Sequence, residues 1–357
     1  MSTFDTLFGK HPVLLAPMAG VTHLPFRLLA SSQGATATVT ELISIKSLHY
    51  SGLDKKNTNF KLDHLISTSA DEPTVGLQVF GDSVSDAELL VSHFRSHAFE
   101  FDFLDLNVGC PVPKVCDPGA GSRLLEEEKL PILRGIIRTI TTGLPGIPFS
   151  IKIRAGYKRP SNFASVSELL NEFELLMVTL HPRTAADNYS MPANHEITKE
   201  LVALCHHPVI ANGDMRSLED SDRIRNQTGA AGTMIGRTAR AYPWIFNKSH
   251  QESVPTEIWI SGLRKYIGNC ERLGYPVVSF IREVYAGMIK GFNHSSAFRV
   301  QATQLGTLKA FWDHIKSLET FFQEKNIEKV YRSLQKHSLN INKSNSVVHD
   351  LPAVYSM

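Results

Sequence analysis

The sequence predicts an α/β fold: a (β/α)8 barrel of the TIM type followed by a small all-α helical bundle. Residues 12 to about 245 alternate between short apolar runs and amphipathic stretches long enough for crossover helices. Most of these runs are continuous rather than alternating, which is typical of parallel strands buried on both faces. Eight such units in succession favour a closed barrel over the alternative, a doubly wound open sheet. Beyond residue 255 the strand-like runs stop and helical periodicity takes over.

The expected strands follow one another along the whole first part of the chain. In order they are VLLAP (13–17), TATVTE (36–41), VGLQVF (75–80), FDFLDLN (101–107), FSIKIRA (149–155), LMVTLHPR (176–183), PVIANG (208–213) and AGTMIGR (231–237). Amphipathic stretches such as 85–97 and 129–143 predict the helices between them. The segment 42–73 is long and polar, so we expect an insertion after the second strand.

Four apolar stripes at helical spacing predict the bundle. The stripes are Leu263, Ile267 and Cys270; Phe280, Val284 and Met288; Leu305, Leu308, Trp312 and Ile315; and Ile327, Val330 and Leu334. Residues 255–340 carry 12 Lys and Arg against 7 Asp and Glu, whereas residues 1–254 carry 24 against 27. The basic helical part is therefore either a solvated face or a nucleic-acid-binding face. The polar, aperiodic residues 341–357 predict a loose tail.

Composition narrows the class of protein. The chain has 357 residues, of which 42% are hydrophobic and 20% charged, and these values exclude a disordered protein. A formal net charge of +2 excludes a polycation. The four cysteines form no CxxC pair, which favours a reducing compartment, so we expect a cytoplasmic protein. No uncharged apolar run reaches the roughly 18 residues of a membrane span. We expect a monomer with no metal and no protein partner.

Polar and small residues collect where the expected strands end, and barrels carry their chemistry at that end. Small residues around Ala16 and Gly20 follow the first strand and would let a flat ligand approach the backbone. Lys152 and Arg154 share one face of the fifth strand because side chains repeat with period two. Glycines end the last two strands, where barrels often bind phosphate. These features suit a flat heteroaromatic ligand that carries a phosphate.

Seven segments, in order, resemble the motif series of the dihydrouridine synthase family. They are APMAGVT (16–22), NVGCP (107–111), GAGSRLL (119–125), IKIRAGY (151–157), HPRTAADNYS (181–190), ANGD (211–214) and MIGRTARAYPWIF (234–246). The resemblance spans nearly the whole barrel, and the basic helical part resembles the family's tRNA-binding domain. It implies an enzyme that reduces particular uridines in tRNA, with FMN bound and NADPH, or alternatively NADH, as co-substrate. It also implies an FMN-binding catalytic barrel over residues 1–247 and a helical tRNA-binding domain over residues 248–340.

By that resemblance, the cofactor site is expected at the strand ends. Its implied residues are Pro17, Met18 and Ala19 against the isoalloxazine, Gln78 and Lys152 at its polar edge, and His181, Asn212, Gly213, Asp214, Gly236 and Arg237 along the ribityl chain and phosphate. The implied substrate contacts are Asn107, Arg154 and Arg183, although Asn107 is equally expected to shape the turn that follows it. A basic lysine beside the reduced ring would stabilise negative charge there.

The reaction that the resemblance implies needs a proton donor as well as a hydride. Saturating the C5–C6 bond of uracil adds a hydride at C6 and a proton at C5. Cys110 stands in a Gly-Cys-Pro turn after the fourth strand, and a thiol with a pKa near 8.5 is mostly protonated at neutral pH. We therefore expect Cys110 to act as the general acid. Cys116, Cys205 and Cys270 are expected to be structural.

Two positions depart from the family pattern. His23 stands where Asp or Asn is usual, and Pro182 replaces the glycine of the HGRT motif, which removes a backbone N–H. Two other functions remain open: a flavin barrel that reduces a free pyrimidine, and a tRNA-binding protein without catalysis. The basic helical part argues against the first, and the presence of Cys110, Lys152 and His181 argues against the second. The sequence does not indicate which tRNA uridine is modified.

Overall fold

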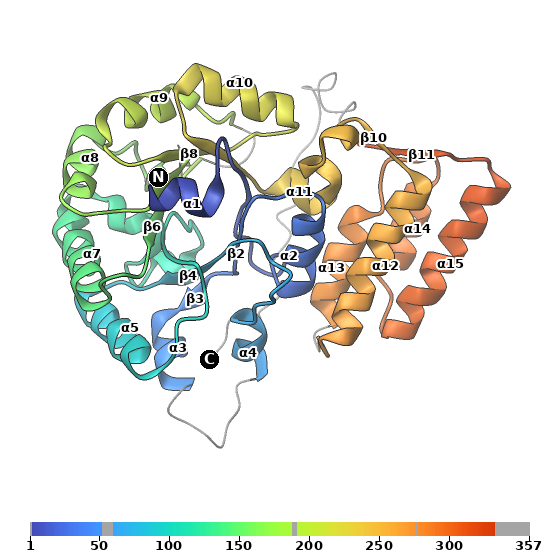
Figure 1. Ribbon diagram of the computed structural model, residues 1–357, viewed down its shortest axis with the longest axis horizontal. Helices are drawn as coiled ribbons and strands as arrows, with labels where there is room; N and C mark the ends of the chain where they lie inside the picture. The colour runs from blue at the N-terminus through green and yellow to red at the C-terminus, as the bar shows by residue number, and fades with distance from the viewer. Residues whose placement is uncertain (1, 52–59, 188–190, 276–277, 333–357) are drawn as a thin grey trace.

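A closed parallel barrel forms the first part of the molecule. The computed structural model describes residues 2–51, 60–187, 191–275 and 278–332 (Figure 1). The strands are β1 (Val13–Leu15), β2 (Thr38–Val39), β3 (Ile43–Ser44), β4 (Val75–Phe80), β5 (Phe103–Val108), β6 (Phe149–Gly156), β7 (Met177–Thr184), β8 (Val209–Asn212) and β9 (Gly232–Ile235). They pair in the order β1-β9-β8-β7-β6-β5-β4-β2, all parallel, and β3 extends the pairing along β4.

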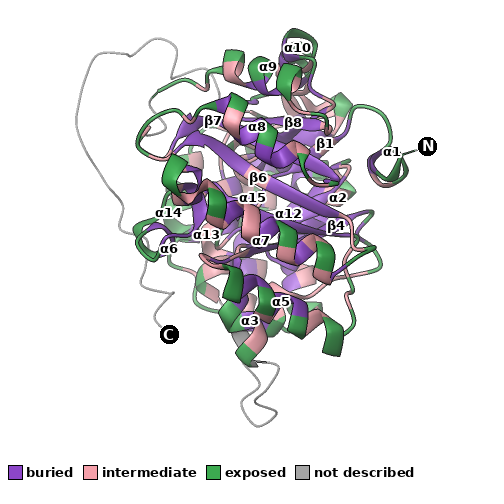
Figure 2. Cartoon of the chain, turned by 90° about the vertical axis from the view of Figure 1, so that its left-hand side faces the viewer, coloured by how far each residue is buried: buried purple, intermediate pink, exposed green. Residues whose placement is uncertain are grey.

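The ring is completed by a parallel bridge between Leu14 and Ala37, which joins β1 to the start of β2. The two ends of the sheet therefore meet, and the predicted barrel is confirmed over the open sheet. Figure 2 shows that the strands, β6 among them, are mostly buried. The helices around them have exposed outer faces. The surrounding helices are α2 (Leu24–Ser32), α5 (Val84–Ser96), α7 (Leu130–Gly143), α8 (Phe163–Asn171), α9 (His195–Leu204), α10 (Leu218–Thr228) and α11 (Arg237–Ala241).

The helix α7 illustrates why these segments are helical. Its apolar residues recur at helical spacing, and Leu133, Ile136, Ile137 and Ile140 are all fully buried against the strands. The expected insertion after the second strand consists, in the described residues, of β3, α3 (Ile45–Ser51) and α4 (Phe60–Leu65). The two-residue strand β3 was not expected because it is too short to show periodicity.

The amino-terminal end of the barrel is covered by α1 (Thr3–Phe8). Phe4 and Phe8 are buried with the inward residues Leu14, Phe103 and Met177. A hollow of about 480 Å³ lies at this end, between α1 and the segments that precede β6, β7 and β8. It is lined by none of the residues expected in the cofactor or substrate site.

The second part of the chain is mostly helical. It contains β10 (Ser253–Pro255), α12 (Thr256–Arg272), α13 (Val278–Met288), α14 (Ser295–Ala302), α15 (Leu308–Glu324) and β11 (Lys329–Tyr331). Three of the predicted stripes lie in α12, α13 and α15, except that Leu305 precedes α15. The fourth stripe is wrong as a helix, because Val330 lies in β11 and pairs with Val254 of the antiparallel β10. Three predicted features lie outside the described residues: Leu334, residues 188–190 of the segment HPRTAADNYS, and the tail 341–357.

The two parts share one hydrophobic core. Tyr242, Trp244 and Phe246, which follow the barrel, are clustered with Trp259 and Leu263 of α12. The packing is close, because a Cβ added to Gly262 would lie 2.6 Å from Cζ2 of Trp244. Across the residues whose structure is described, no helix has the length and apolar character to span a bilayer, and no three His, Cys, Asp or Glu side chains are grouped as metal ligands.

Candidate active site at the carboxyl ends of the strands

The turn after β5 holds Cys110 through a set of short hydrogen bonds. Oδ1 of Asn107 accepts from the backbone N–H of Gly109 at 3.1 Å and from that of Cys110 at 2.8 Å. The carbonyl of Cys110 accepts from the backbone N–H and hydroxyl of Ser122, at 3.1 and 2.9 Å. The structure therefore supports the second interpretation of Asn107, that it shapes the turn, and contact with the substrate stays a prediction.

Two further features of the GAGSRLL motif fix the same turn. Gly121 has φ +60°, and a Cβ there would lie 2.7 Å from the carbonyl oxygen of Cys110, so only glycine fits. The thiol of Cys116 is 3.0 Å from that oxygen. Cys116 is thus buried beneath the turn and contacts its backbone, whereas Cys110 is half-buried just after β5.

The Cys110 thiol is protonated at neutral pH. Burial raises its pKa above the ordinary value for cysteine, and neighbouring Cys116 acts in the same direction. The backbone N–H of Val112 and the charges of Arg154 and Lys152 act the other way without reversing the shift. A protonated thiol in this position can donate a proton, and it is a poor nucleophile.

Beneath this turn lies a chain of buried polar groups that β4, β5 and β6 contribute at matching register. Nδ2 of Asn107 donates to Oε1 of Gln78 at 2.9 Å, and Nε2 of Gln78 donates to Asp105 at 2.7 Å. Asp105 also accepts from the hydroxyl of Ser150 at 2.6 Å, and burial raises its pKa. Asp105 was not among the expected site residues, and the available signal was a carboxylate in the middle of an apolar strand.

Lys152 is a cation without a partner among the described residues of this site. The residue is partly buried, and its ammonium group has no hydrogen bond or ion pair with the residues that the structure describes. Burial lowers its pKa to about 8, with Arg154 adding to the effect while Asp105 and Cys110 oppose it. Arg154 is committed instead, because Nε donates to the carbonyl of Gly109 at 2.7 Å and Nη1 to that of Thr184 at 3.0 Å. Its expected contact with the substrate stays a prediction.

A row of charged groups links β7 to the ends of β8 and β9. Arg183, which is 2% exposed, donates to Nε2 of His181 at 3.0 Å and to Oδ2 of Asp214 at 2.7 Å, while its Nε donates to the carbonyl of Met191 at 2.7 Å. Because Nε2 of His181 accepts, its ring proton is on Nδ1. Arg237 pairs with the other oxygen of Asp214 at 2.9 Å and is half exposed.

The electrostatics of this row are those of an anion site. Burial, followed by the charges of Lys152, Arg154, Arg183 and Arg237, lowers the pKa of His181 so far that the ring is neutral. Burial acts to raise the pKa of Asp214, but hydrogen bonds from Arg183 and Ala193 and the two arginine charges outweigh it and lower that pKa. Two arginines around one carboxylate, with a lysine nearby, leave a local excess of positive charge.

Backbone geometry supplies the rest of this site. Gly213 has φ +126°, and a Cβ there would lie 3.0 Å from Cδ2 of His181. A Cβ on Gly236 would lie 3.4 Å from Cβ of Ala16 and 3.7 Å from Sδ of Met18, so the end of β9 touches the residues that follow β1. Asn212 is occupied in joining strands, since its Nδ2 donates to the carbonyl of Met234 at 2.7 Å.

Both departures from the family pattern have a structural explanation. Pro182 lies where the register of β6 against β7 shifts, between the pairs Arg154–His181 and Gly156–Thr184. The regular hydrogen bonding between the strands is already interrupted at this point, so the missing N–H of proline is tolerated. His23 is fully buried at the amino end of α2, where its ring stacks on Tyr266 of α12 and Nε2 lies 3.2 Å from the tyrosine hydroxyl. Burial lowers its pKa to about 3, so it joins the two parts as a neutral group.

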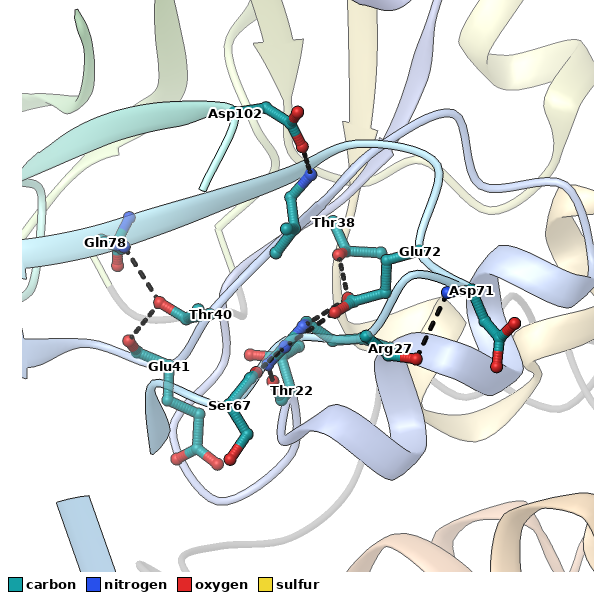
Figure 3. Close-up of polar contacts among 12 residues, drawn as sticks. Thr22, Arg27, Thr38, Thr40, Glu41, Ser67, Asp71, Glu72, Gln78 and Asp102 are labelled. Atoms are coloured by element: carbon teal, nitrogen blue, oxygen red, sulfur yellow. Dashed lines mark hydrogen bonds and ion pairs between the residues drawn. The ribbon is translucent and has the colours of Figure 1, made fainter. Parts of the chain in front are cut away.

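The segment after β1, residues 17–20, is named the first loop here. The backbone N–H of Gly20 donates to Oε2 of Glu41 at 2.6 Å. Figure 3 shows Thr40 between Glu41 and Gln78, and beside them the buried ion pair of Arg27 with Glu72, whose Nε–Oε1 distance is 2.8 Å. Glu41 was missed at the sequence level; the available signal was an acid directly after a strand of small and β-branched residues.

The residues present fit a flavin phosphate. An unpaired ammonium on Lys152 suits the polar edge of a ring that becomes anionic on reduction, and it has no competing partner among the described side chains. The glycines Gly213 and Gly236 leave room that a Cβ would fill, next to Arg237. Met18 and Ala19 lie at the surface of the first loop, half-buried and exposed respectively.

The fold and this site define a (β/α)8-barrel protein with a protonated thiol and an anion site at the carboxyl ends of its strands. The family model for dihydrouridine synthase matches residues 14–326. The chain belongs to the dihydrouridine synthase family, as its motifs predicted.

Individual relatives agree with that assignment. tRNA-dihydrouridine synthase B of Pseudomonas aeruginosa is 34% identical over 239 residues, which cover 66% of this chain and 68% of that protein. tRNA-dihydrouridine synthase B of Xanthomonas axonopodis pv. citri is 28% identical over 314 residues, or 86% of each chain. A solved old yellow enzyme homologue from Zymomonas mobilis has 10% identity and a TM-score of 0.47, and covers 66% of this chain and 87% of that one, a likeness too low to bear on function.

Proposed function

We propose that this protein is an FMN-dependent tRNA-dihydrouridine synthase that reduces the C5–C6 bond of uridine, with Cys110 as the general acid and NADPH as the source of electrons. The observation that carries the proposal is the Cys110 turn. Asn107 and Ser122 bind the backbone of Cys110, whose thiol has a raised pKa, and Lys152 nearby has no partner among the described residues. The relatives' names support tRNA as the substrate.

The cofactor would be held by residues on both sides of the barrel mouth. The first loop (with Pro17, Met18 and Ala19) would receive the ring, and Gln78 and Lys152 its polar edge. The phosphate would lie at Gly213, Gly236 and Arg237, with Arg183 and Asp214 holding Arg237 and His181 in place. When bound, FMN would supply the hydride that is added to C6 of uracil.

The chain's own residues complete the reduction. The Cys110 thiol gives its proton to C5, and the thiolate formed is stabilised by the charges of Arg154 and Lys152 and by the N–H of Val112. These are the groups that lower the thiol's pKa, so they favour the charge that appears as the proton leaves. Solvent reprotonates the thiolate for the next cycle.

Recognition of tRNA is assigned to the helical part. Its excess of Lys and Arg suits phosphate contacts, and a uridine inside folded tRNA must be turned out to reach the strand ends. A proposed boundary near residue 247 separates the barrel from this part, although both share the core around Trp244.

A single experiment tests this function. The purified protein is given NADPH and tRNA that lacks dihydrouridine, and dihydrouridine is measured together with the flavin spectrum. We expect dihydrouridine at one or a few positions, and no reduction of free uridine or uracil under the same conditions. Reduction of the free pyrimidine with tRNA left unchanged would refute the proposal in favour of the free-pyrimidine enzyme. Binding of tRNA without flavin or turnover would favour the non-catalytic alternative.

A further inference from the structure

Glu41 is a buried carboxyl group in the site that the reaction above does not use. It follows β2 and is 2% exposed. Its Oε2 accepts the backbone N–H of Gly20 at 2.6 Å, and its Oε1 is buried with no hydrogen-bond partner in the described part of the chain. Buried polar atoms are nearly always paired, so an unpaired one in a native site calls for an explanation.

Its contacts join two of the expected flavin-binding segments. The side chain of Glu41 holds the first loop through Gly20, which has φ +71°. Its carbonyl accepts from the hydroxyl of Thr40 at 3.0 Å, and that hydroxyl accepts from the backbone N–H of Gln78 at 2.9 Å. Glu41 thus contacts the first loop through its side chain and, through Thr40, the backbone of Gln78 on β4; Figure 3 shows the second of these contacts.

The helical part covers the same loop from the other side. A Cβ on Gly20 would lie 3.8 Å from Cδ1 of Phe280 in α13, so the loop is enclosed between Glu41 and α13. The charged groups that face Glu41 are Arg27 on α2 and Glu283 on α13. Each has its own partner, since Arg27 pairs with Glu72 at 2.8 Å and Glu283 with Arg240 at 2.7 Å.

We propose that Glu41 is a positioning residue, which holds the first loop in the conformation that receives the flavin, and that ionisation of its carboxyl group sets how firmly the loop is held. The proposal rests on the proposed function for the identity of the ligand. A carboxylate accepts a backbone N–H more strongly than a neutral carboxylic acid does. The loop is therefore held more firmly when Glu41 is charged.

The environment of Glu41 places this change near neutral pH. Burial raises the pKa of Glu41 to about 7, while the Gly20 N–H and Arg27 lower it and Glu283 raises it further. The group is neutral below that pH and charged above it. Affinity for FMN should therefore rise with pH through about 7 on account of Glu41.

The test compares Glu41→Gln, Glu41→Ala and the exposed control Glu88→Gln. Two quantities are measured between pH 6 and 8: the FMN dissociation constant, and hydrogen exchange at the Gly20 amide in the flavin-free protein. We expect Glu41→Ala to bind FMN at least tenfold more weakly at pH 7.5 and to exchange the Gly20 amide at least tenfold faster. Glu41→Gln keeps an acceptor for Gly20 but should lose the rise of affinity between pH 6 and 7.5, which we expect to be threefold or more in the parent and in Glu88→Gln.

The outcomes separate this inference from the proposed function. Values for Glu41→Ala within twofold of the parent, at every pH, would overturn the role of Glu41. If Glu41→Ala does not fold, Glu41→Gln decides, because an unchanged pH profile in that variant would also overturn it. If the parent binds no flavin, the proposed function fails, while the Gly20 amide still reports whether Glu41 holds the loop.

Discussion

Replacing Arg183 with lysine distinguishes a residue that holds the site from one that contacts tRNA. Arg183 is buried and donates in three directions, to the carbonyl of Met191, to Nε2 of His181 and to Oδ2 of Asp214. A lysine ammonium is a single point on a flexible stem and cannot reproduce this fork. If Nζ keeps the charged partner Asp214, the buried Nε2 of His181 and the carbonyl of the exposed residue Met191 both lose the hydrogen bond from Arg183.

The expected loss of stability follows from that count. Removing the donor of one buried acceptor costs about 1–3 kcal/mol, and the Met191 carbonyl can bind water instead, so Arg183→Lys should lower the free energy of unfolding by about 1–3 kcal/mol. The matched control is Arg134→Lys, since Arg134 is partly exposed and its Nε donates to both carboxylate oxygens of Glu172, at 2.9 and 3.1 Å. An exposed pair of this kind contributes about 0–1 kcal/mol, so the control should change little.

The assay is urea unfolding of both variants, followed by an FMN titration. We expect Arg183→Lys to lose affinity for FMN as well as stability, because His181 and Asp214 lose their common donor. If Arg183→Lys unfolds at the parent's urea concentration, keeps its FMN affinity and raises only the KM for tRNA, the reasoning is refuted. Arg183 would then be the substrate contact that the family resemblance implied.

Three other predictions use the same preparations. Cys110→Ala should keep the fold and FMN but lose about 10²–10⁴-fold in uridine reduction, and a single-turnover rate within threefold of the parent would contradict its role as acid. Burial lowers the pKa of Lys152 to about 8, so its charge is present below that pH and lost above it. The affinity for FMN should therefore fall as pH rises through about 8 in the parent. Lys152→Met should bind FMN more weakly and show no such fall, and Arg237→Ala should bind FMN more weakly at all pH values. If a fluorescence titration gives the parent's curves for both variants, that result counts against the cation site. A chain ending at residue 247 should aggregate, because it exposes the core around Trp244; a soluble, yellow, monomeric product by light scattering would show that the barrel stands alone.

The barrel was predictable because strands that are buried on both faces are apolar at successive positions, a pattern that is visible in the sequence. Strands β1 and β8 lie in mostly apolar runs, VLLAP and PVIANG, and the succession of eight strand-and-helix units predicted the closed sheet. The short strands β3, β10 and β11 could not be predicted this way, since two or three residues show no period. For Val330 a helical interpretation was therefore wrong: its partner Val254 lies far away in the sequence.

The site was predictable as a set of residues and less so as a set of contacts. The motifs indicated Cys110 and Lys152, and the structure places Cys110 just after β5 and Lys152 within β6, at the register of Asn107. The motifs did not indicate that Arg154 and Arg183 form hydrogen bonds with groups of the protein itself. Such hydrogen bonds depend on loops that meet only in the folded chain. For the same reason Asp105 and Glu41 were missed, since a carboxylate in a strand has no function until its neighbours are known.

The shared core also sets the order in which the chain can finish folding during synthesis. Tyr242 and Trp244 leave the ribosome before their partners in α12 and α15, which extend to Glu324. At about 5–20 residues per second, the roughly 80 residues from Trp244 to Glu324 take roughly 4–16 seconds to be synthesised. During that interval a nearly complete barrel presents an uncovered aromatic face. We therefore expect the amino-terminal two thirds of this protein to depend on the remainder for their solubility while they are being made, and an interrupted translation to yield an aggregation-prone fragment.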